Sequence, residues 1–461
     1  MAIGNSLSPT AIIALLATLS GVYLIFLPSS LPQEQARAFG LSVMVIGLWA
    51  TARLPEHITS LLFFLLAMLI SVAPSGVIFS GFASSALWMV FAGLVIALAF
   101  KRSGLSERIA LGIAHRLNGS YLILISGVLV IGLLLGFLMP SSMGRIMLLI
   151  PITLGLADHL GFEPGSNGRT GLILAASFGT FVPAFAILPS NVPNMVLLGT
   201  SEALFHISPL YGEYLLLHFP ILGFLKSILI VLLITLRYPD EPRLQWSDTA
   251  STTPISPQER KMAILLLLAL LLWFTDFLHH VSPAWIALAA ALLVMLPRFG
   301  LIDTKQFNSE INFSSLFFVA GVLGLGALIS HSGLGARLAE HLIELLPLEP
   351  GNNLINYVSL TFTAIVTGIL TTLPGVPAVL TPLADKIADS AGLPIETVLM
   401  TQVVGFSTTL FLYQAPPLVV ALQLAGEKMR PAMQMTLLLA LATLILLLPL
   451  DYLWWRLLGW L

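Results

Sequence analysis

The sequence predicts an all-α polytopic membrane protein, and three observations lead to that class. Apolar residues make up 57% of the 461 positions and charged residues only 9%, whereas about a quarter of the residues in a soluble domain are charged. Apolar runs of about 20 residues, enough to cross a bilayer, recur along the whole chain. The two halves of the chain also resemble each other. A net charge of −2 gives no reason to expect nucleic-acid binding, and the absence of cysteine excludes disulfides and thiolate metal sites.

The predicted spans follow one another with few polar residues between them. The first, Ala11–Leu27, has no basic residue before it and no small-residue cleavage pattern after it, so we expect a retained span rather than a signal peptide. Spans are expected near residues 10–28, 38–54, 57–74, 86–101, 214–236, 261–279, 283–297 and 311–330, and the final segments run over about 396–424 and 432–458. Together with the less regular stretches, this predicts about 11 transmembrane helices and two re-entrant hairpins.

Four matches between the halves occur in the same order and 224 to 231 positions apart. They pair Trp88–Leu94 with Leu316–Val322, Ser103–Ala110 with Ser332–Ala339, Pro151–Asp158 with Pro382–Asp389, and Val192–Asn194 with Pro416–Leu418. Similar composition alone does not explain Gly, Pro, Arg and Asp at fixed places. Internal repeats with interrupted helices at corresponding positions are typical of alternating-access transporters.

Basic residues predict the orientation. With the segments 103–118 and 237–261 in the cytoplasm, 14 of the 20 Lys and Arg residues lie on that side, as the positive-inside rule requires. The others are Arg37, Arg337, Lys386 and Arg456 outside, and Arg145 and Lys226 within membrane segments. The two Ser-Gly-Leu repeats then face opposite sides, so the repeat is inverted. Amphipathic stretches after them, Glu107–Leu117 and Gly335–Leu346, are expected in the membrane interface.

This pattern predicts a division of the chain into five parts. They are N-terminal scaffold helices (1–76), a first inverted repeat (77–236) with a hairpin (119–160) and a broken helix (170–200), a cytoplasmic linker (237–261), second scaffold helices (262–310), and a second inverted repeat (311–461) with a hairpin (355–391) and a broken helix (396–424).

The hairpins are predicted from length and from helix-breaking residues. The 119–160 stretch would be roughly 60 Å long as one straight helix, about twice the bilayer core. It is interrupted at Met139–Arg145, and the second half is interrupted at Thr371–Pro377. Two Pro-rich breaks follow, Leu188–Asn194 and Tyr413–Pro417. Non-helical backbone at membrane depth lines a cavity or is buried in protein; two ordinary spans joined by a turn outside the membrane are the alternative.

The order of these elements resembles the divalent anion:sodium symporter family, which carries dicarboxylates, citrate or sulfate, over roughly residues 80–430 and more loosely over the whole chain. Its Ser-Asn-Thr motif with a following Leu-Pro corresponds to Ser141–Met143 with Ile150-Pro151, and to Thr372–Pro374 with Thr381-Pro382. Its Pro-Pro-Asn turn corresponds to Val192–Asn194 and Pro416–Leu418. The resemblance implies a homodimer with scaffold and elevator-type transport parts, and sodium and substrate sites at the hairpin tips and unwound loops.

Some positions depart from the family pattern. Both Asn residues of the hairpin motifs are replaced, by Ser142 and Leu373, and the Gly-rich stretch that supplies sodium ligands reads Phe181–Ala184. Sodium would therefore depend on backbone carbonyls near Ser141, Ser142, Thr372 and Pro183. No organic cofactor is expected, and sodium is the one ion that the resemblance implies.

Arg145 is a charge that the family pattern lacks at this position. A charged residue in mid-membrane costs about 2.5–3.5 kcal/mol on insertion scales, and no Asp or Glu is expected near it. We therefore expect Arg145 to bind an anionic substrate through two hydrogen bonds; bonding to hairpin carbonyls is the alternative. Lys226 is expected to snorkel to the interface, and a role in substrate binding is the alternative. His206 and His218 are expected at the interface.

The predicted function is secondary transport of small divalent anions across the inner (plasma) membrane by an elevator-like mechanism, sodium-independent with Arg145 binding the anion. Di- or tricarboxylates are the first choice of substrate, and sulfate or sulfonate the second. A cation/proton antiporter or arsenite-type permease is the alternative, although it needs a mid-membrane carboxylate; no constellation for an enzyme is seen. The predicted substrate-binding residues are Ser141, Ser142, Met143, Gly144, Arg145, Asn191, Pro193, Asn194, Thr371, Thr372, Gly375, Val376, Gln414 and Pro416.

Overall fold

The computed structural model describes residues 9–27, 31–51, 53–105, 107–109, 120–139, 141–242, 254–298 and 301–461, and no strand occurs among them. Clustering of contacts divides the chain into two compact units. Unit 1 is Met1–Leu87, Met195–Ser208 and Asn312–Phe406, and unit 2 is Trp88–Asn194, Pro209–Ile311 and Ser407–Leu461. This helical architecture, with its many apolar helices, confirms the predicted all-α polytopic membrane protein.

In the described part of the chain, seven helical stretches are long and apolar enough to cross a membrane. They are Ser85–Arg102, Tyr121–Leu138, Asn167–Ala186, Tyr211–Arg237, Phe313–His331, Asn353–Leu370 and Met429–Leu458. Shorter apolar helices are Ala11–Phe26, Glu56–Leu69, Pro283–Met295, Ile395–Phe406 and Pro416–Ala425. Each predicted simple span corresponds to one or more helices.

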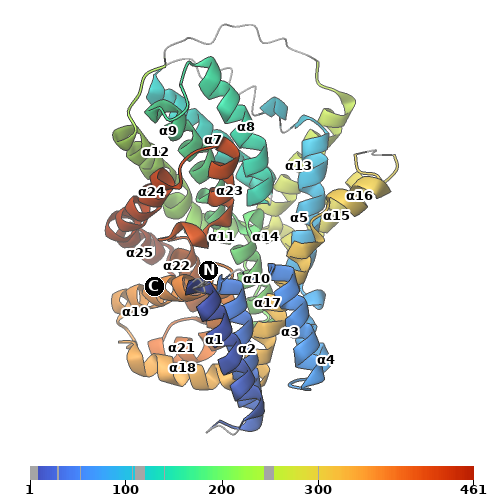
Figure 1. Cartoon of the computed structure of the whole chain (residues 1–461), viewed down its shortest axis with the longest axis vertical. Coiled ribbons are helices and arrows are strands. Elements are labelled where there is room, and N and C mark those ends of the chain that lie inside the picture. The colour runs from blue at the N-terminus through green and yellow to red at the C-terminus, as the bar shows by residue number, and fades with distance from the viewer. Residues whose placement is uncertain are drawn as a thin grey trace, which may run out of the picture. The chain divides into compact units, whose positions relative to one another are not determined.

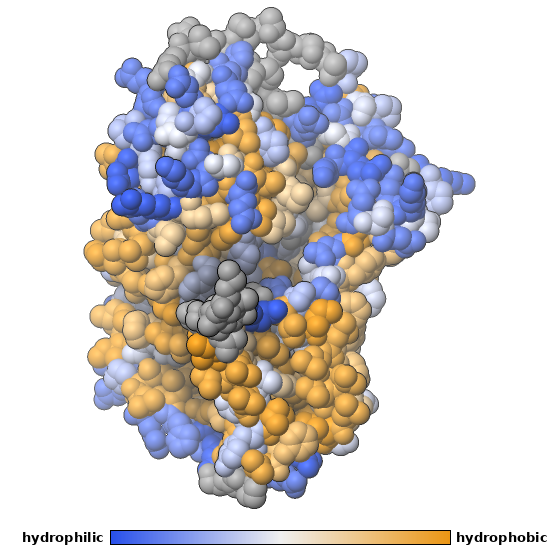
Figure 2. Space-filling view, in the orientation of Figure 1, coloured by the Kyte–Doolittle hydropathy of each residue, from blue (hydrophilic) through white to orange (hydrophobic). Residues whose placement is uncertain are grey.

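Unit 1 begins with a closely packed helix pair. Its helices are α1 (Pro9–Phe26), α2 (Gln33–Thr51), α3 (Glu56–Leu69), α4 (Ser75–Ile78), η1 (Ser80–Ala83), most of α10 (Val192–Phe205), α17 (Phe313–His331), α18 (Leu334–Leu345), α19 (Asn353–Leu370), α20 (Gly375–Leu380), η5 (Thr381–Leu383), α21 (Ala384–Ala391) and α22 (Ile395–Phe406). The helices α1 and α2 lie side by side (Figure 1), and a Cβ added to Gly21 would lie 2.6 Å from the carbonyl oxygen of Gly40. Small residues permit this approach, as they do between membrane helices. Apolar side chains such as Ile13 and Leu16 are exposed on α1. Figure 2 shows that much of the visible surface is apolar.

Unit 2 contains the first hairpin and both long π-bulged helices. Its elements are most of α5 (Ser85–Arg102), α7 (Tyr121–Leu138), α8 (Ser142–His159), α9 (Asn167–Phe181), η2 (Pro183–Ala186), η3 (Leu188–Ser190), α11 (Tyr211–His218), η4 (Phe219–Leu225), α12 (Lys226–Arg237), α13 (Pro257–Phe274), α14 (Asp276–His279), α15 (Pro283–Met295), α16 (Thr304–Glu310), η6 (Leu412–Gln414), α23 (Pro416–Ala425), α24 (Met429–Ala442), η7 (Thr443–Leu447) and α25 (Leu448–Leu458). The segments η4 and η7 are π-helical, and such bulges often occur at functional sites.

The two Ser-Gly-Leu repeats form the same local structure. The hydroxyl of Ser103 donates to the carbonyl oxygen of Phe100 (2.8 Å) and accepts from the amide of Leu105 (3.2 Å). Ser332 makes the equivalent bonds to Ile329 (3.3 Å) and from Leu334 (3.4 Å). The following glycines, Gly104 and Gly333, both have positive φ, at 81° and 70°. The predicted match between the halves therefore extends to backbone geometry.

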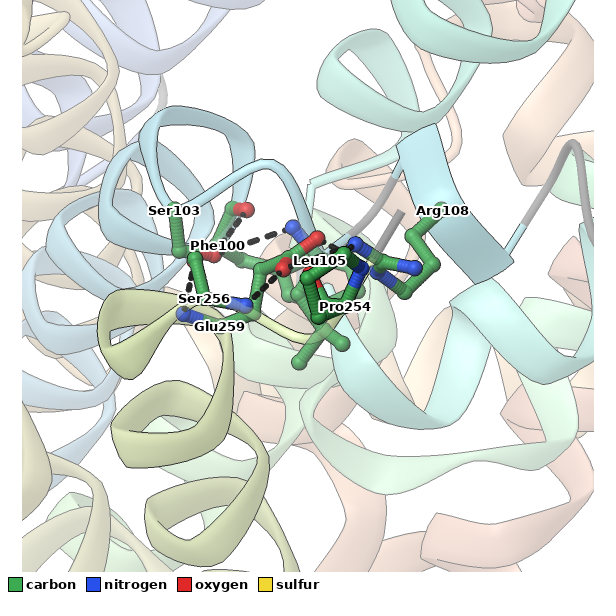
Figure 3. Close-up of polar contacts among 7 residues, drawn as sticks. All are labelled: Phe100, Ser103, Leu105, Arg108, Pro254, Ser256 and Glu259. Atoms are coloured by element: carbon green, nitrogen blue, oxygen red, sulfur yellow. Dashed lines mark hydrogen bonds and ion pairs between the residues drawn. The ribbon is translucent and has the colours of Figure 1, made fainter. Parts of the chain in front are cut away.

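The segments expected to share the cytoplasmic side contact each other within unit 2 (Figure 3). Arg108 donates from Nε to Oε1 of Glu259 at 2.6 Å and from Nη2 to Oε2 at 3.0 Å. Ser256 caps α13 by accepting from the amide of Glu259, whose carboxylate accepts from the amide of Ser256. The guanidinium, with help from Ser256, lowers the pKa of Glu259 to about 2. The ion pair thus ties residues 107–109 to the start of α13.

Two amphipathic stretches were predicted to lie in the membrane interface. One of them, Gly335–Leu346, forms α18, from Leu334 to Leu345. Of the stretch Glu107–Leu117, residues 110–117 lie outside the described residues.

Candidate functional site

The tip of the first hairpin is a short extended connection between α7 and α8. Met139 and Ser141 both have extended backbones, and Pro140 lies outside the described residues. The hydroxyl of Ser141 caps α8 by accepting from the amide of Gly144 at 3.2 Å. This is an ordinary N-cap, and it aligns the first turn of α8 so that Arg145 points into unit 2.

Arg145 joins the hairpin to the broken helix that follows. Its side chain is fully buried, with 0% exposure. Nε and Nη2 both donate to the carbonyl oxygen of Thr180, at 3.1 and 2.9 Å. Nη1 donates to the carbonyl oxygens of Met139 and of Ser190 (3.1 Å) and to the Ser190 hydroxyl (3.2 Å), while Nη2 also donates to Ser142 Oγ (3.0 Å).

These contacts decide how Arg145 is used in this conformation. Each guanidinium nitrogen has a protein acceptor, so none is left for the carboxylate clamp expected from the sequence. The observed contacts instead resemble the alternative given above, in which Arg145 bonds to backbone carbonyl oxygens of the hairpin. Thr180 lies in the last turn of α9, whose terminal carbonyls carry partial negative charge and are stabilised by a cation.

The first break runs from Val182 to Asn191 and is buried throughout. Asn194 stabilises this segment, because its Nδ2 donates to the carbonyl oxygens of Ala184, Phe185 and Ile187 at 3.3, 3.1 and 3.0 Å. Asn191 caps α10 by accepting from the amide of Asn194 at 3.1 Å. Among the described residues, no partner is found for Asn191 Nδ2 or Asn194 Oδ1. The break therefore presents one free amide donor and one free acceptor.

The second break is longer than predicted, running from Ser407 to Ala415 in unit 2, and it has a similar amide. Oε1 of Gln414 accepts from the amides of Leu410 (3.0 Å) and Phe411 (2.9 Å), so it shapes the turn. The side chain is 4% exposed, and its Nε2 has no partner in the described part of the chain. Gln414, like Asn191, thus uses its oxygen for the local backbone and leaves its NH₂ group free.

The second hairpin tip lies in unit 1 and repeats the cap of the first. Thr372 Oγ1 accepts from the amide of Gly375 at 3.2 Å, just as Ser141 accepts from Gly144. The hydroxyl of Thr371 donates to the carbonyl oxygen of Thr367 at 2.7 Å. Val376 has 0% exposure and stands in the sequence place of Arg145. The charge is therefore a property of the first tip alone.

The remaining predicted site residues line these segments. Met143 and Gly144 lie in the first turn of α8 and are half-buried, Pro183 opens η2 and is buried, and Pro193 lies in the first turn of α10 and is buried. Pro416 begins α23 and is exposed.

The expectation that Lys226 snorkels to the interface was wrong. Lys226 begins α12 immediately after the π segment η4, and its side chain is 1% exposed. Its Nζ donates to the carbonyl oxygen of Ser407 in the second break at 2.8 Å. The π turn, which includes Pro220 without its own N–H, changes the helical phase and turns Lys226 inward rather than along the surface.

Two further titratable groups are also buried. Asp451, which was not singled out from the sequence, lies on α25, has 0% exposure and is within electrostatic range of Lys226. His218, expected at the interface, has 0% exposure instead and packs its ring edge-on against Tyr214 and Trp455. Both residues lie on the helical stretches that contain π turns.

A sodium ion does not fit the carbonyl cluster at the first break. The oxygens of Met139, Thr180 and Ser190 already converge on the Arg145 guanidinium. A second cation about 4 Å from that charge would be repelled by about 4 kcal/mol at an effective dielectric constant of 20. No group of three His, Cys, Asp or Glu residues that could hold a metal occurs among the described residues.

Relatives of the chain include named transporters. It is 22% identical over 420 residues to a membrane protein of Cupriavidus necator, covering 86% of this chain and 82% of that protein. It is 22% identical over 444 residues to a transporter of Haemophilus influenzae, covering 92% and 93%. It is 23% identical over 270 residues to the L-tartrate/succinate antiporter of Escherichia coli K12, covering 55% and 54%.

Two solved structures share the fold. The YdaH transporter of Alcanivorax borkumensis matches with a TM-score of 0.55 at 18% identity, over 93% of this chain and 99% of that one. MtrF of Neisseria gonorrhoeae, from a class of antimetabolite efflux pumps, matches with a TM-score of 0.54 at 12% identity, over 96% and 94%. At these identities the likeness concerns the fold.

The transmembrane region of sodium:sulfate symporters matches residues 8–461, nearly the whole chain. The family resemblance drawn from the hairpin and Pro-rich motifs is thereby confirmed, as is the expectation of a transporter rather than an enzyme. The chain belongs to the sodium:sulfate symporter family and is a multi-pass secondary anion transporter.

Proposed function

We propose that this transporter moves small di- or tricarboxylates across the inner membrane without sodium, and that the two helix breaks hold the anion. The observation that carries the proposal is the Arg145 cluster. Its guanidinium takes the carbonyl oxygens of Met139, Thr180 and Ser190, which would otherwise be available to a mobile cation. A fixed positive charge at this point also offsets the charge of an anion bound nearby.

Two amide groups supply candidate hydrogen bonds to the anion. Asn191 Nδ2 and Gln414 Nε2 are buried donors without a partner among the described residues. Leaving such a group unsatisfied costs about 1–3 kcal/mol, and a substrate carboxylate oxygen would remove that cost. Sulfate and sulfonates offer oxygens of the same kind and are the second choice of substrate.

The family resemblance and the bacterial relatives complete the proposal. We assign the two inverted repeats with their re-entrant hairpins to the moving transport part and the helices of 1–76 and 262–310 to a scaffold, in a homodimer of the bacterial inner membrane. Thr371, Thr372, Gly375 and Val376 at the second tip, in unit 1, stay predicted substrate-binding residues.

A cation/proton antiporter is disfavoured by charge. It needs a membrane carboxylate free to exchange a proton for a cation. Asp451 is buried, but it lies within electrostatic range of the positive charge of Lys226. The Lys226 ammonium also donates to the carbonyl oxygen of Ser407 in the second break.

Exchange of one anion for another is a second candidate for the transport cycle. The relative named as an L-tartrate/succinate antiporter supports it. Exchange predicts that internal succinate accelerates the uptake of external labelled succinate, whereas empty vesicles take up little.

Isosteric substitutions test the binding role of the amides. Asn191→Asp and Gln414→Glu keep the oxygen that accepts from the local backbone and replace the free NH₂ with an anionic oxygen. In proteoliposomes with labelled succinate, tartrate and sulfate, we expect each change to raise KM at least tenfold while the melting temperature in detergent stays close to that of the wild type.

Gln423→Glu is the matched control, because Gln423 lies on α23, the helix that follows the second break, and is exposed. It should leave KM unchanged. If Asn191→Asp and Gln414→Glu both retained the wild-type KM, the two breaks would not be the anion site.

A further inference from the structure

The two buried cations of unit 2 differ in one chemical respect. Arg145 stays charged at every accessible pH, whereas a lysine in a buried place can lose its proton. Arg145 has an acceptor for each nitrogen. The single hydrogen bond of Lys226 within the described part of the chain goes to the carbonyl oxygen of Ser407. Arg145 is therefore fixed in charge and in position, whereas the charge of Lys226 can change with its protonation.

Lys226 borders a small cavity at the second break, and the cavity is lined by both polar and apolar side chains. The cavity has a volume of about 10 Å³ and is lined on its polar side by Lys226, Ser407, Thr408, Thr409 and Thr436. That volume accommodates roughly one water molecule. The hydroxyl of Thr409 is buried and has no partner among the described residues. A proton leaving the ammonium thus has an acceptor site next to it.

The same cavity connects the lysine to the first break. Phe178, Phe181 and Val182 form part of its apolar lining, and they flank Thr180, the acceptor of Arg145. The last turn of α9 therefore lies between the two cations. A change at Lys226 alters the surroundings of both breaks.

Few other titratable groups lie near Lys226. Asp451 on α25 acts on it electrostatically, and His218 lies on α11, before the same π segment. Of the helices packed against α12, α7 contains no Lys, Arg, His, Asp or Glu. The Arg169 of α9 pairs with Asp158, and the Arg430 of α24 lies at the opposite end from η7.

We propose that Lys226 is a proton-binding site and that the proton it takes up is coupled to movement of the anion. With the proton bound, the ammonium holds the Ser407 carbonyl and adds a positive charge that favours anion binding. When the proton passes to water in the cavity, a neutral amine remains, the positive charge is lost and the hold on Ser407 weakens. The step is a reversible transfer of one proton from nitrogen to water and needs no other reactant. It rests on the proposed anion transport.

The experiment measures anion uptake and proton movement in the same vesicles. Proteoliposomes containing the full chain and the pH dye pyranine are placed in sodium-free buffer with labelled succinate or sulfate, with protein-free vesicles as the background. We expect uptake to acidify the interior, and an inward proton gradient to speed uptake several-fold. Uptake without proton movement would overturn the inference, whereas absence of any anion uptake would overturn the proposed function.

Variants locate the proton. Lys226→Arg keeps a permanent charge, so uptake by this variant should no longer be accelerated by the proton gradient. Asp451→Asn removes the nearby negative charge and should move the half-maximal pH of uptake to lower pH. His218→Gln should leave both readouts as in the wild type. Proton coupling that persists in Lys226→Arg, an unchanged pH profile in Asp451→Asn, or loss of coupling in His218→Gln would each contradict the assignment.

Discussion

Nε and Nη2 of Arg145 converge on one acceptor, the carbonyl oxygen of Thr180, at 3.1 and 2.9 Å. This bond joins the first turn of α8 to the last turn of α9, so the hairpin tip and the first break form one buried unit. A guanidinium forms it because its planar fork presents two donors in the same direction.

Removing the Arg145 fork should destabilise the protein strongly. Arg145→Met leaves the carbonyls of Met139, Thr180 and Ser190 without their donor, and each buried unsatisfied group costs about 1–3 kcal/mol. Arg145→Lys should recover only part of the loss, since an ammonium cannot span these acceptors. Melting temperature in detergent is the measurement.

Arg102→Met is the control for loss of a cation. Arg102 pairs with Glu310 at 2.8 Å, but both side chains are 39% exposed, and such pairs contribute at most about 1 kcal/mol. If the melting temperatures of Arg145→Met and Arg102→Met agreed within about a degree, the hydrogen bonds of Arg145 would have no structural role.

The close approach of α7 to α9 should tolerate no added methyl group. A Cβ on Gly132 would lie 2.8 Å from the carbonyl carbon of Gly179 and from the amide nitrogen of Thr180. Gly132→Ala therefore pushes the helices apart and should cost about 1–3 kcal/mol. It also displaces Thr180, so uptake should fall as well.

Gly155→Ala is the matched control on α8, where an added Cβ meets nothing within 4 Å and the position is exposed. It should leave the melting temperature unchanged or slightly raised, because alanine favours helix. Equal effects of the two substitutions would contradict the packing described for α7 and α9.

The Arg108–Glu259 pair predicts a pH-dependent stability. The pKa of Glu259 is lowered from 4.5 to about 2, so the pair stabilises the folded protein fully above about pH 5 and loses this effect as the pH falls towards 2. The difference in melting temperature between the wild type and Glu259→Gln should be constant from pH 7 to 5 and shrink at lower pH. A constant difference down to pH 3 would show that Glu259 does not stabilise through its charge.

The repeats and breaks could be predicted because they depend on local signals. The Ser-Gly-Leu segments, the Pro-rich turns and the capping hydroxyls of Ser141 and Thr372 each act over a few residues. The family followed from the same motifs. Arg145 was singled out because an isolated charge in an apolar run needs a partner.

The partners themselves could not be predicted. The acceptors of Arg145 at Thr180 and Ser190 are 35 and 45 residues away, and main-chain carbonyls leave no trace in the sequence. Lys226 was expected at the interface and Asp451 was not singled out, because π turns give no simple signal in the sequence. The π turns at Phe219–Leu225 and Thr443–Leu447 shift the phase of both helices and bury these charges.

We propose that fixed cations of the protein stand where a mobile sodium ion would otherwise bind. This proposal is tested by the uptake of labelled succinate, tartrate and sulfate into proteoliposomes, with sodium replaced by choline on both sides. We expect at least one anion to be taken up at the same initial rate with and without a sodium gradient. Uptake that requires sodium, and that rises in proportion to the sodium concentration, would show that a mobile sodium ion is part of the site.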